Sequence, residues 1–360
     1  MKKIFTLLIG MILWDSGHAQ QDSTIWKPEM SIGLRSYFMS TSYADDFKNE
    51  HAWGQMAKLS LMSKLPYHFR IKAEYLGFLK ILSSDFGTLD SQVPNLNRYE
   101  VGLFDVNHLD RTVFGKIGNL HLDYAYANFK AKLGRMEVNT PFINAQDGRL
   151  SPTYVEGINW ELQINPMISI NHHLITGISP RSTGNWFSIG ESIGMYPVGR
   201  DVTGQPSEYA GNTNSDYIHI LSLKYKFQPN SILLLNHNLV NNIYSSYLAQ
   251  WDKNWKLPNN SLQAISGILA TVQHGIGEGG NEEISLRYKN PEDFNWVISG
   301  KLGIKSKRSL WHVNYTKMQG NGRFLSPREW GKDPFYTFIP RERNEGLGQV
   351  DAISTFFQHA

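Results

Sequence analysis

The run His68-Phe69-Arg70-Ile71-Lys72-Ala73-Glu74-Tyr75 alternates apolar and charged side chains. In an extended strand, the odd-numbered members of this run share one face and the even-numbered members share the other, because successive side chains point to opposite sides. A membrane β-barrel requires this pattern, since lipid lies outside its wall and water lies inside. The run therefore predicts one amphipathic strand of a transmembrane, antiparallel β-barrel.

The same alternation returns along the chain, and the connections between the strand-like segments differ in length. Tight turns are expected at 65–67, 165–166, 228–230 and 305–308, where proline, asparagine, serine and lysine gather. Long polar connections are expected at 41–55, 82–119, 139–156, 179–216 and 319–349. Outer-membrane barrels have short periplasmic turns and long external loops, whereas a soluble sandwich has no reason for this asymmetry. We expect an all-β chain with about fourteen strands.

The first 19 residues have the pattern of a secretory signal peptide. Lys2 and Lys3 precede an apolar run at 4–14, and Gly17-His18-Ala19 fits a small-x-small cleavage site. The apolar run is well short of the roughly 20 residues that a spanning helix needs. The sequence therefore predicts a signal peptide at 1–19 and a single barrel domain at 20–360.

Composition excludes several classes of function. The chain has no cysteine, which excludes disulfides, cysteine-ligated metals and thiol catalysis. Its net charge of +3 is too small to suggest a nucleic-acid partner. His172 and His173 would face opposite sides of a strand, the glycine-rich segment 275–280 lacks a βαβ context, and no Gly-x-Ser-x-Gly motif is present. We expect no enzyme activity, no cofactor and no metal.

The strand faces that would meet water carry more basic than acidic residues. The acidic positions are Glu74, Asp123 and Glu161. The basic positions are Arg35, Arg70, Lys72, Lys130, Lys132, Lys224, Lys226, Lys301 and Lys305. Such a wall around a channel would attract anions or carboxylates by focusing the field. The alternative is that these residues only solvate a polar face and set no selectivity.

Two further segments have a distinctive composition. One is Gly322-Arg323-Phe324-Leu325-Ser326-Pro327-Arg328-Glu329-Trp330-Gly331-Lys332-Asp333-Pro334-Phe335-Tyr336-Thr337-Phe338, with Pro340-Arg341-Glu342-Arg343-Asn344-Glu345-Gly346 after it. The other is Lys132-Leu133-Gly134-Arg135-Met136, which leads to Asn139-Thr140-Pro141-Phe142-Ile143-Asn144 and then to Asp147-Gly148-Arg149-Leu150-Ser151-Pro152 and Glu156-Gly157. Together they resemble a strand and two constriction loops of OprD-type outer membrane porins, in their Bacteroidetes-like version.

The resemblance implies an eighteen-stranded barrel in the outer membrane of a Gram-negative bacterium. Such porins pass small solutes, among them amino acids and other carboxylates, past two inward-folded loops and a row of basic side chains. Arg135 would join the basic row. The constriction candidates are Asn144, Asp147, Arg149 and Tyr154 from the first loop, and Arg328, Glu329, Asp333, Arg341, Arg343 and Glu345 from the second. Alternatively, the pairs Arg328–Glu329 and Arg341–Glu345 would only hold the long loop folded.

The sequence therefore predicts a porin for passive, partly selective diffusion of small solutes, embedded in outer-membrane lipid. The chain stops at Ala360, soon after a fourteenth strand-like segment at 350–357, so a barrel of eighteen strands would be incomplete at the C-terminus. A smaller barrel and an unusual closure are the other interpretations. A monomer and a trimer are both possible. The alternative function is a secreted, soluble β-sandwich binding protein.

Overall fold

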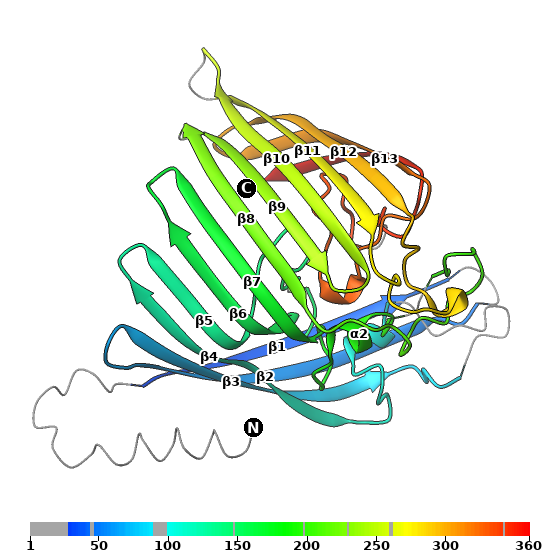
Figure 1. The fold of residues 1–360 in the computed structure, drawn as a ribbon. Helices are drawn as coiled ribbons and strands as arrows, with labels where there is room; N and C mark the ends of the chain where they lie inside the picture. Colours follow the sequence, from blue (N-terminus) through cyan, green and yellow to red (C-terminus); the bar gives the residue numbers. More distant parts are fainter. Residues whose placement is uncertain are drawn as a thin grey trace, which may run out of the picture.

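The computed structural model describes residues 28–43, 47–88, 99–146, 148–196, 199–228, 230–258, 262–340 and 343–360. Over these residues the chain forms one antiparallel sheet of 14 strands, in which each strand pairs with its neighbours in sequence (Figure 1). The first and last strands lie at the two edges of this sheet. The predicted signal peptide at 1–19 lies outside the described residues.

The strands are β1 (Glu29–Thr41), β2 (Glu50–Lys64), β3 (Phe69–Ser83), β4 (Val113–Tyr126), β5 (Phe129–Met136), β6 (Tyr154–Gln163), β7 (Ile168–Ser179), β8 (Ile218–Gln228), β9 (Ser231–Val240), β10 (Tyr244–Lys256), β11 (Gln263–Gly275), β12 (Phe294–Lys305), β13 (Ser309–Gly320) and β14 (Val350–His359). The short helical turns are η1 (Val101–Leu103), α2 (Ile189–Ser192), η2 (Ile284–Leu286) and η3 (Arg328–Trp330). The predicted all-β fold is confirmed. A β-sandwich would need two packed sheets, and the described residues form one.

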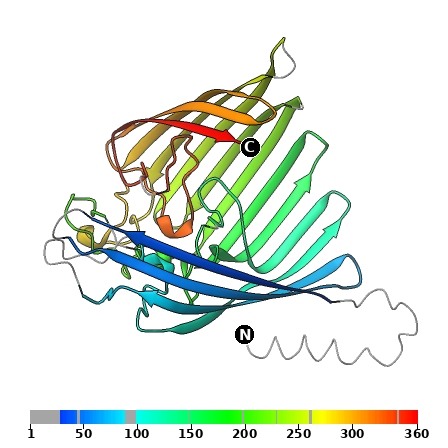
Figure 2. The same ribbon diagram turned by 180° about the vertical axis from the view of Figure 1, so that it is seen from behind.

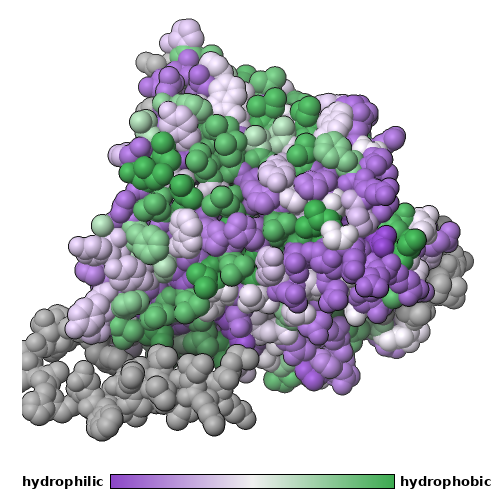
Figure 3. Space-filling view, in the orientation of Figure 1, coloured by the Kyte–Doolittle hydropathy of each residue, from purple (hydrophilic) through white to green (hydrophobic). Residues whose placement is uncertain are grey.

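The two faces of the sheet differ as the alternation predicts. On β1, Met30, Ile32 and Leu34 are 65%, 70% and 82% exposed and point outward. The side chains between them point to the concave side, where the inner wall buries polar groups such as Glu74 on β3 and Asn236 on β9. Hydrophobic residues gather over the strands on the face shown in Figure 3. A lipid-facing wall accounts for an apolar surface that a soluble domain would bury.

Local residue chemistry sets the turns. At the predicted turn after β2, Tyr67 and His68 both have positive φ values, 57° and 67°, as a tight hairpin with the right-handed twist of its strands requires. One turn breaks the predicted alternation of lengths, because β9 and β10 are joined on the long-loop side by residues 241–243 alone. There Asn242 has a φ of 60°, and the amide of Ile243 donates to the carbonyl of Val240 at 3.1 Å. Asparagine tolerates this conformation better than most residues, so three residues suffice.

Two of the predicted long loops are shorter than expected. Residues 50–55 belong to β2 and residues 113–119 belong to β4. Irregularities in both stretches interrupt the alternation of apolar and polar side chains. The register between β2 and β3 shifts at Trp53/Gly54, and the register between β3 and β4 shifts between Ala73 and Tyr75. A bulge adds one residue to a strand and reverses the faces beyond it, which a strict alternation rule misses.

The long loops fold onto the concave side of the sheet, where Figure 2 shows η3 and its neighbouring loop segments. Their side chains are as buried as those of a soluble core: Phe104, Ile143, Leu150 and Trp330 are at most 2% exposed. Among the described residues, no helix has the length and apolar character to cross a membrane. The loops therefore form a packed plug on the concave side of the sheet.

Candidate channel constriction

Three loops meet at the centre of this plug: the β5–β6 loop (137–153), the β7–β8 loop (180–217) and the β13–β14 loop (321–349). Asn144 joins the first to the third. Its side-chain amide donates to the carbonyl of Lys332 at 2.9 Å and accepts from the Lys332 amide at 3.1 Å, and its backbone amide donates to Trp330. Gly331 permits this contact, because it has a φ of 147° and an added Cβ would lie 2.6 Å from the Asn144 Oδ1 atom. Asn144, a predicted constriction residue, thus holds the β5–β6 loop against the β13–β14 loop.

Glu329 connects the β13–β14 loop to the β7–β8 loop. Its carboxylate accepts hydrogen bonds from the backbone amides of Gly194, at 3.2 Å, and Tyr196, at 3.1 Å. Burial raises the pKa of Glu329 above its ordinary value, and the backbone hydrogen bonds act in the opposite direction. Next to it, the indole of Trp330 donates to the hydroxyl of Ser192 at 2.8 Å. These bonds hold η3 against the short helix α2.

Arginines from all three loops come together beside this junction. They are Arg149 of the β5–β6 loop, Arg181 of the β7–β8 loop and Arg343 of the β13–β14 loop. Burial and, after it, repulsion from the positive charge of Arg181 lower the pKa of Arg149 to about 10. The pKa of Arg343 is lowered to about 10 by the same two causes in the same order. We call these three residues the arginine cluster.

Three contacts position Arg149 and Arg343 of the arginine cluster. Gly102 makes room for Arg149, since an added Cβ there would lie 2.0 Å from the Arg149 Nη1 atom. The Arg149 carbonyl accepts a hydrogen bond from the guanidinium of Arg35 on β1 at 2.8 Å. Arg343 donates to the carbonyl of Gly331 at 2.7 Å. The loop fold therefore holds like charges close together, an arrangement that an anion would stabilise.

Acidic residues of the same loop lie next to the cluster. Glu345 forms an ion pair with Arg328. Asp333 is 4% exposed, and burial raises its pKa to about 7, although Arg343 acts in the opposite direction. One Asp333 oxygen accepts from the amide of Phe335 at 3.4 Å, and the other is buried without a hydrogen-bond partner among the described residues. The constriction therefore combines fixed positive charges with a carboxyl group that ionises near neutral pH.

Of the three remaining constriction candidates, the structure describes only Tyr154. Tyr154 begins β6 and is 1% exposed, and its hydroxyl donates to the Glu74 carboxylate at 2.7 Å, so it belongs to the wall. Asp147 and Arg341 lie outside the described residues. Arg181 was missed by sequence reasoning. Its only signal is its place in Ser179-Pro180-Arg181, directly after a strand end.

Strand register places the predicted basic wall. Arg70 pairs with Asp123, Asp123 with Lys132, and this lateral row continues along the concave face. The wall residues that share this inward alternation are Arg35, Arg70, Lys72, Lys130, Lys132, Lys224, Lys226, Lys301 and Lys305. Arg135 lies apart from them. It shares the alternation of the 58% exposed Leu133, forms an ion pair with Glu156 at 2.7 Å and lies 4.4 Å from the ring centre of Trp186.

Several wall charges are neutralised by neighbours. Arg70 lies 3.5 Å from Asp123, Lys72 lies 3.7 Å from Glu74, and Lys301 lies 3.0 Å from Asp252. In the part of the chain that the structure describes, no such ion pair involves the following lysines: Lys130, Lys132, Lys224, Lys226 and Lys305. These lysines lie on β5, β8 and β12, toward the end of the sheet with the short turns. The basic residues of the wall whose charge no ion pair offsets therefore lie on the short-turn side of the plug.

Comparisons with known proteins agree with this architecture. A family model described as outer membrane porin, OprD family, matches residues 104–337. The solved structure of OpdK from Pseudomonas aeruginosa is 14% identical, with a TM-score of 0.67 over 92% of this chain and 76% of that one. OccK8 (OprE) of the same organism is 14% identical, with a TM-score of 0.69 over 91% of this chain and 78% of that one. OccAB4 of Acinetobacter baumannii is 16% identical, with a TM-score of 0.64 over 87% of this chain and 72% of that one. A search of curated protein sequences gives no match.

Proposed function

Because the chain belongs to the OprD family of outer membrane porins, a family of passive channels for small solutes in Gram-negative bacteria, we propose that its channel prefers solutes that carry a carboxylate, including amino acids. The preference would arise at the arginine cluster. Residues 1–19 would direct export, and residues 20–360 would form the barrel domain. The protein is a channel in outer-membrane lipid and not an enzyme.

The observation that carries the proposal is the convergence of Arg149, Arg181 and Arg343 from three separate loops. A guanidinium presents a planar fork of donors that matches a carboxylate and keeps its charge at every physiological pH. The carbonyl of Gly331 holds Arg343 but carries no charge, and among the described residues only Glu345 and Asp333 partly offset the positive charge of Arg343. A carboxylate that enters the cluster would relieve the repulsion, while competition from Glu345 and Asp333 would keep its binding weak enough for release.

The basic wall would complete the route. Lys224 and Lys226 are exposed on the inward alternation of β8, near the end with the short turns. A carboxylate that leaves the cluster would meet these charges next, and successive weak sites favour conduction over trapping. The solved structure of OpdK contains vanillate, an aromatic carboxylate, which supports the same class of solute here.

The test is the permeation of a carboxylate and a neutral solute of the same size. Full-length protein in liposomes should admit benzoate faster than benzyl alcohol, and Arg181→Gln should reduce the benzoate rate by about tenfold, the loss expected for one charge-assisted hydrogen bond. Lys253→Gln is the matched control, because Lys253 lies on the outward alternation of β10, over the ring of Trp255. Equal entry of both solutes into liposomes with active channels would refute the preference.

A further inference from the structure

Six aromatic rings form a continuous belt across the outer surface of the sheet, one from each strand from β6 to β11. They are Trp160, His172, His219, His237, Tyr247 and His274. The centres of successive rings are separated by 5.1, 4.7, 6.4, 4.5 and 6.2 Å. We call these six residues the ring belt. Four of its members are histidines and none is acidic.

The ring belt faces outward. Trp160 pairs with His172, His172 with Leu221, Leu221 with His237 and His237 with Tyr247, so all five share one alternation. Leu221 is 42% exposed and Tyr247 is 48% exposed. The inward neighbour of His172 on the same strand, His173, is 6% exposed. The sequence prediction that the two adjacent histidines face opposite sides agrees with this register.

The four members of the belt on β8 to β11 lie near the strand ends that carry the long loops, whereas Trp160 and His172 lie closer to the short-turn ends of β6 and β7. His219 is next to the first residue of β8, and His274 is next to the last residue of β11. Long loops mark the external side of outer-membrane barrels, and a girdle of aromatic residues marks each lipid boundary there. Tyrosine and tryptophan are the usual members. Here imidazole, which donates and accepts hydrogen bonds, takes most of the positions.

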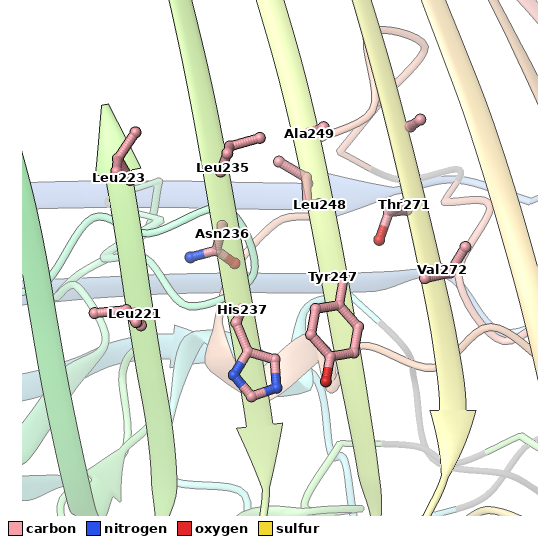
Figure 4. Close-up of a pocket in the computed structure, with 11 residues that line it drawn as sticks. Leu221, Leu223, Leu235, Asn236, His237, Tyr247, Leu248, Ala249, Thr271 and Val272 are labelled. Atoms are coloured by element: carbon pink, nitrogen blue, oxygen red, sulfur yellow. The ribbon is translucent and has the colours of Figure 1, made fainter. Parts of the chain in front are cut away.

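An apolar groove begins at the belt and runs along the strands away from the long loops. Its volume is about 490 Å³. Figure 4 shows His237 and Tyr247 side by side at one end, and Leu223, Leu235 and Ala249 at the other. Ala249 pairs with both Leu235 and Ala270, so two small side chains hollow the surface between larger neighbours. The groove therefore has an apolar length and a polar end at the outer boundary of the membrane.

We propose that the groove and the ring belt form a binding site for a phosphorylated lipid of the outer leaflet. An acyl chain would lie in the groove, and the lipid phosphate would accept hydrogen bonds from the imidazoles. His219 and His274 have no hydrogen-bond partner among the described residues, and His237 uses its Nε2 atom with Ser245 at 2.9 Å, which leaves its Nδ1 atom. The groove matches the apolar part of such a lipid, and a belt with donors and without carboxylates matches its anionic part.

The experiment measures lipids that remain bound to the full-length protein by native mass spectrometry. The probes are dimyristoyl phosphatidic acid, which has an exposed phosphate, and dimyristoyl phosphatidylcholine, which has the same chains and a zwitterionic headgroup. The wild-type protein should retain the first about tenfold more strongly, the factor for one charge-assisted hydrogen bond. The combined variant His219→Leu, His237→Leu and His274→Leu should bring the ratio close to one.

A second variant separates the groove from the belt. Ala249→Leu fills the groove and should weaken the retention of both lipids while the ratio between them stays unchanged. Tyr75→Gln is the control, because Tyr75 is an outward ring, 54% exposed, on the distant strand β3. An equal retention of both lipids by the wild type would overturn the proposal. So would a dimer or trimer that the histidine variants dissociate, since the belt would then contact another copy of the chain.

Discussion

The guanidinium of Arg328 forms an ion pair with the carboxylate of Glu345, 17 residues away in the chain, and not with the adjacent Glu329. Glu329 points the other way and accepts two backbone amides of the β7–β8 loop. The Glu329 carboxylate thus holds the β13–β14 loop against the β7–β8 loop, and the Glu345 carboxylate balances positive charge within the constriction. The alternative interpretation, in which Arg328 pairs with Glu329, does not describe this contact, because a buried carboxylate with two amide donors is already satisfied.

Glu345→Gln tests this division of roles. The substitution removes a negative charge beside Arg328 and Arg343 but leaves a group that can accept a hydrogen bond. We expect anion selectivity to rise, because the positive charge of the arginine cluster is no longer offset. The reversal potential across a planar bilayer with a KCl gradient measures the change. A shift toward cation selectivity would contradict the assigned role of Glu345.

Asn144→Ala tests the fastening of the two predicted constriction loops. The change removes both side-chain bonds to Lys332, which costs about 2 kcal/mol. We expect a larger single-channel conductance and more frequent current fluctuations, since the plug is less firmly held. Asn128→Ala is the matched control, because its side chain donates to the carbonyl of Gln163 at a short turn, far from the plug. Similar effects in both variants would mean that Asn144 has no special part in the plug.

The strand wall was predictable from sequence because lipid and water impose a period of two on every strand. That pattern correctly placed Arg70, Lys72 and Glu74 on the inner face of β3. The plug was not predictable in the same way. Asn144 and Lys332 are 188 residues apart, and no local pattern links them. Arg181 enters the cluster only because the folded β7–β8 loop brings it there, so its role follows from tertiary packing alone.

The ionisation of Asp333 should make the channel sensitive to pH. Burial raises its pKa to about 7, so the neutral carboxyl predominates below that pH and the carboxylate predominates above it. A new negative charge next to Arg343 opposes anions, so anion selectivity should fall as the pH rises from about 6 to about 8. Reversal potentials at several pH values measure this decline.

The same pKa has a consequence for stability. A carboxyl whose pKa is higher in the folded than in the unfolded state stabilises the fold most at low pH, below its unfolded value of about 4, and this contribution is lost as the pH rises through about 7. Asp333→Asn, which stays neutral, should retain its stability across that range and remove the pH dependence of selectivity. An unchanged pH profile in this variant would assign the titration to another group, such as Glu329.

The lysines beyond the plug give the last prediction. Lys224 lies on the inward alternation of β8, and in the described residues no ion pair neutralises it. A unit charge about 8 Å from a passing anion in water contributes about 0.5 kcal/mol, a factor of about two in local concentration. Lys224→Gln should therefore reduce anion conductance by about twofold at low salt and have almost no effect in 1 M KCl, where the Debye length is about 3 Å. Lys253→Gln on the outward face should leave conductance unchanged at both salt concentrations. If the two variants behaved alike, or if the effect of Lys224→Gln persisted at high salt, the wall would act as a solvated polar surface and the arginine cluster alone would set selectivity.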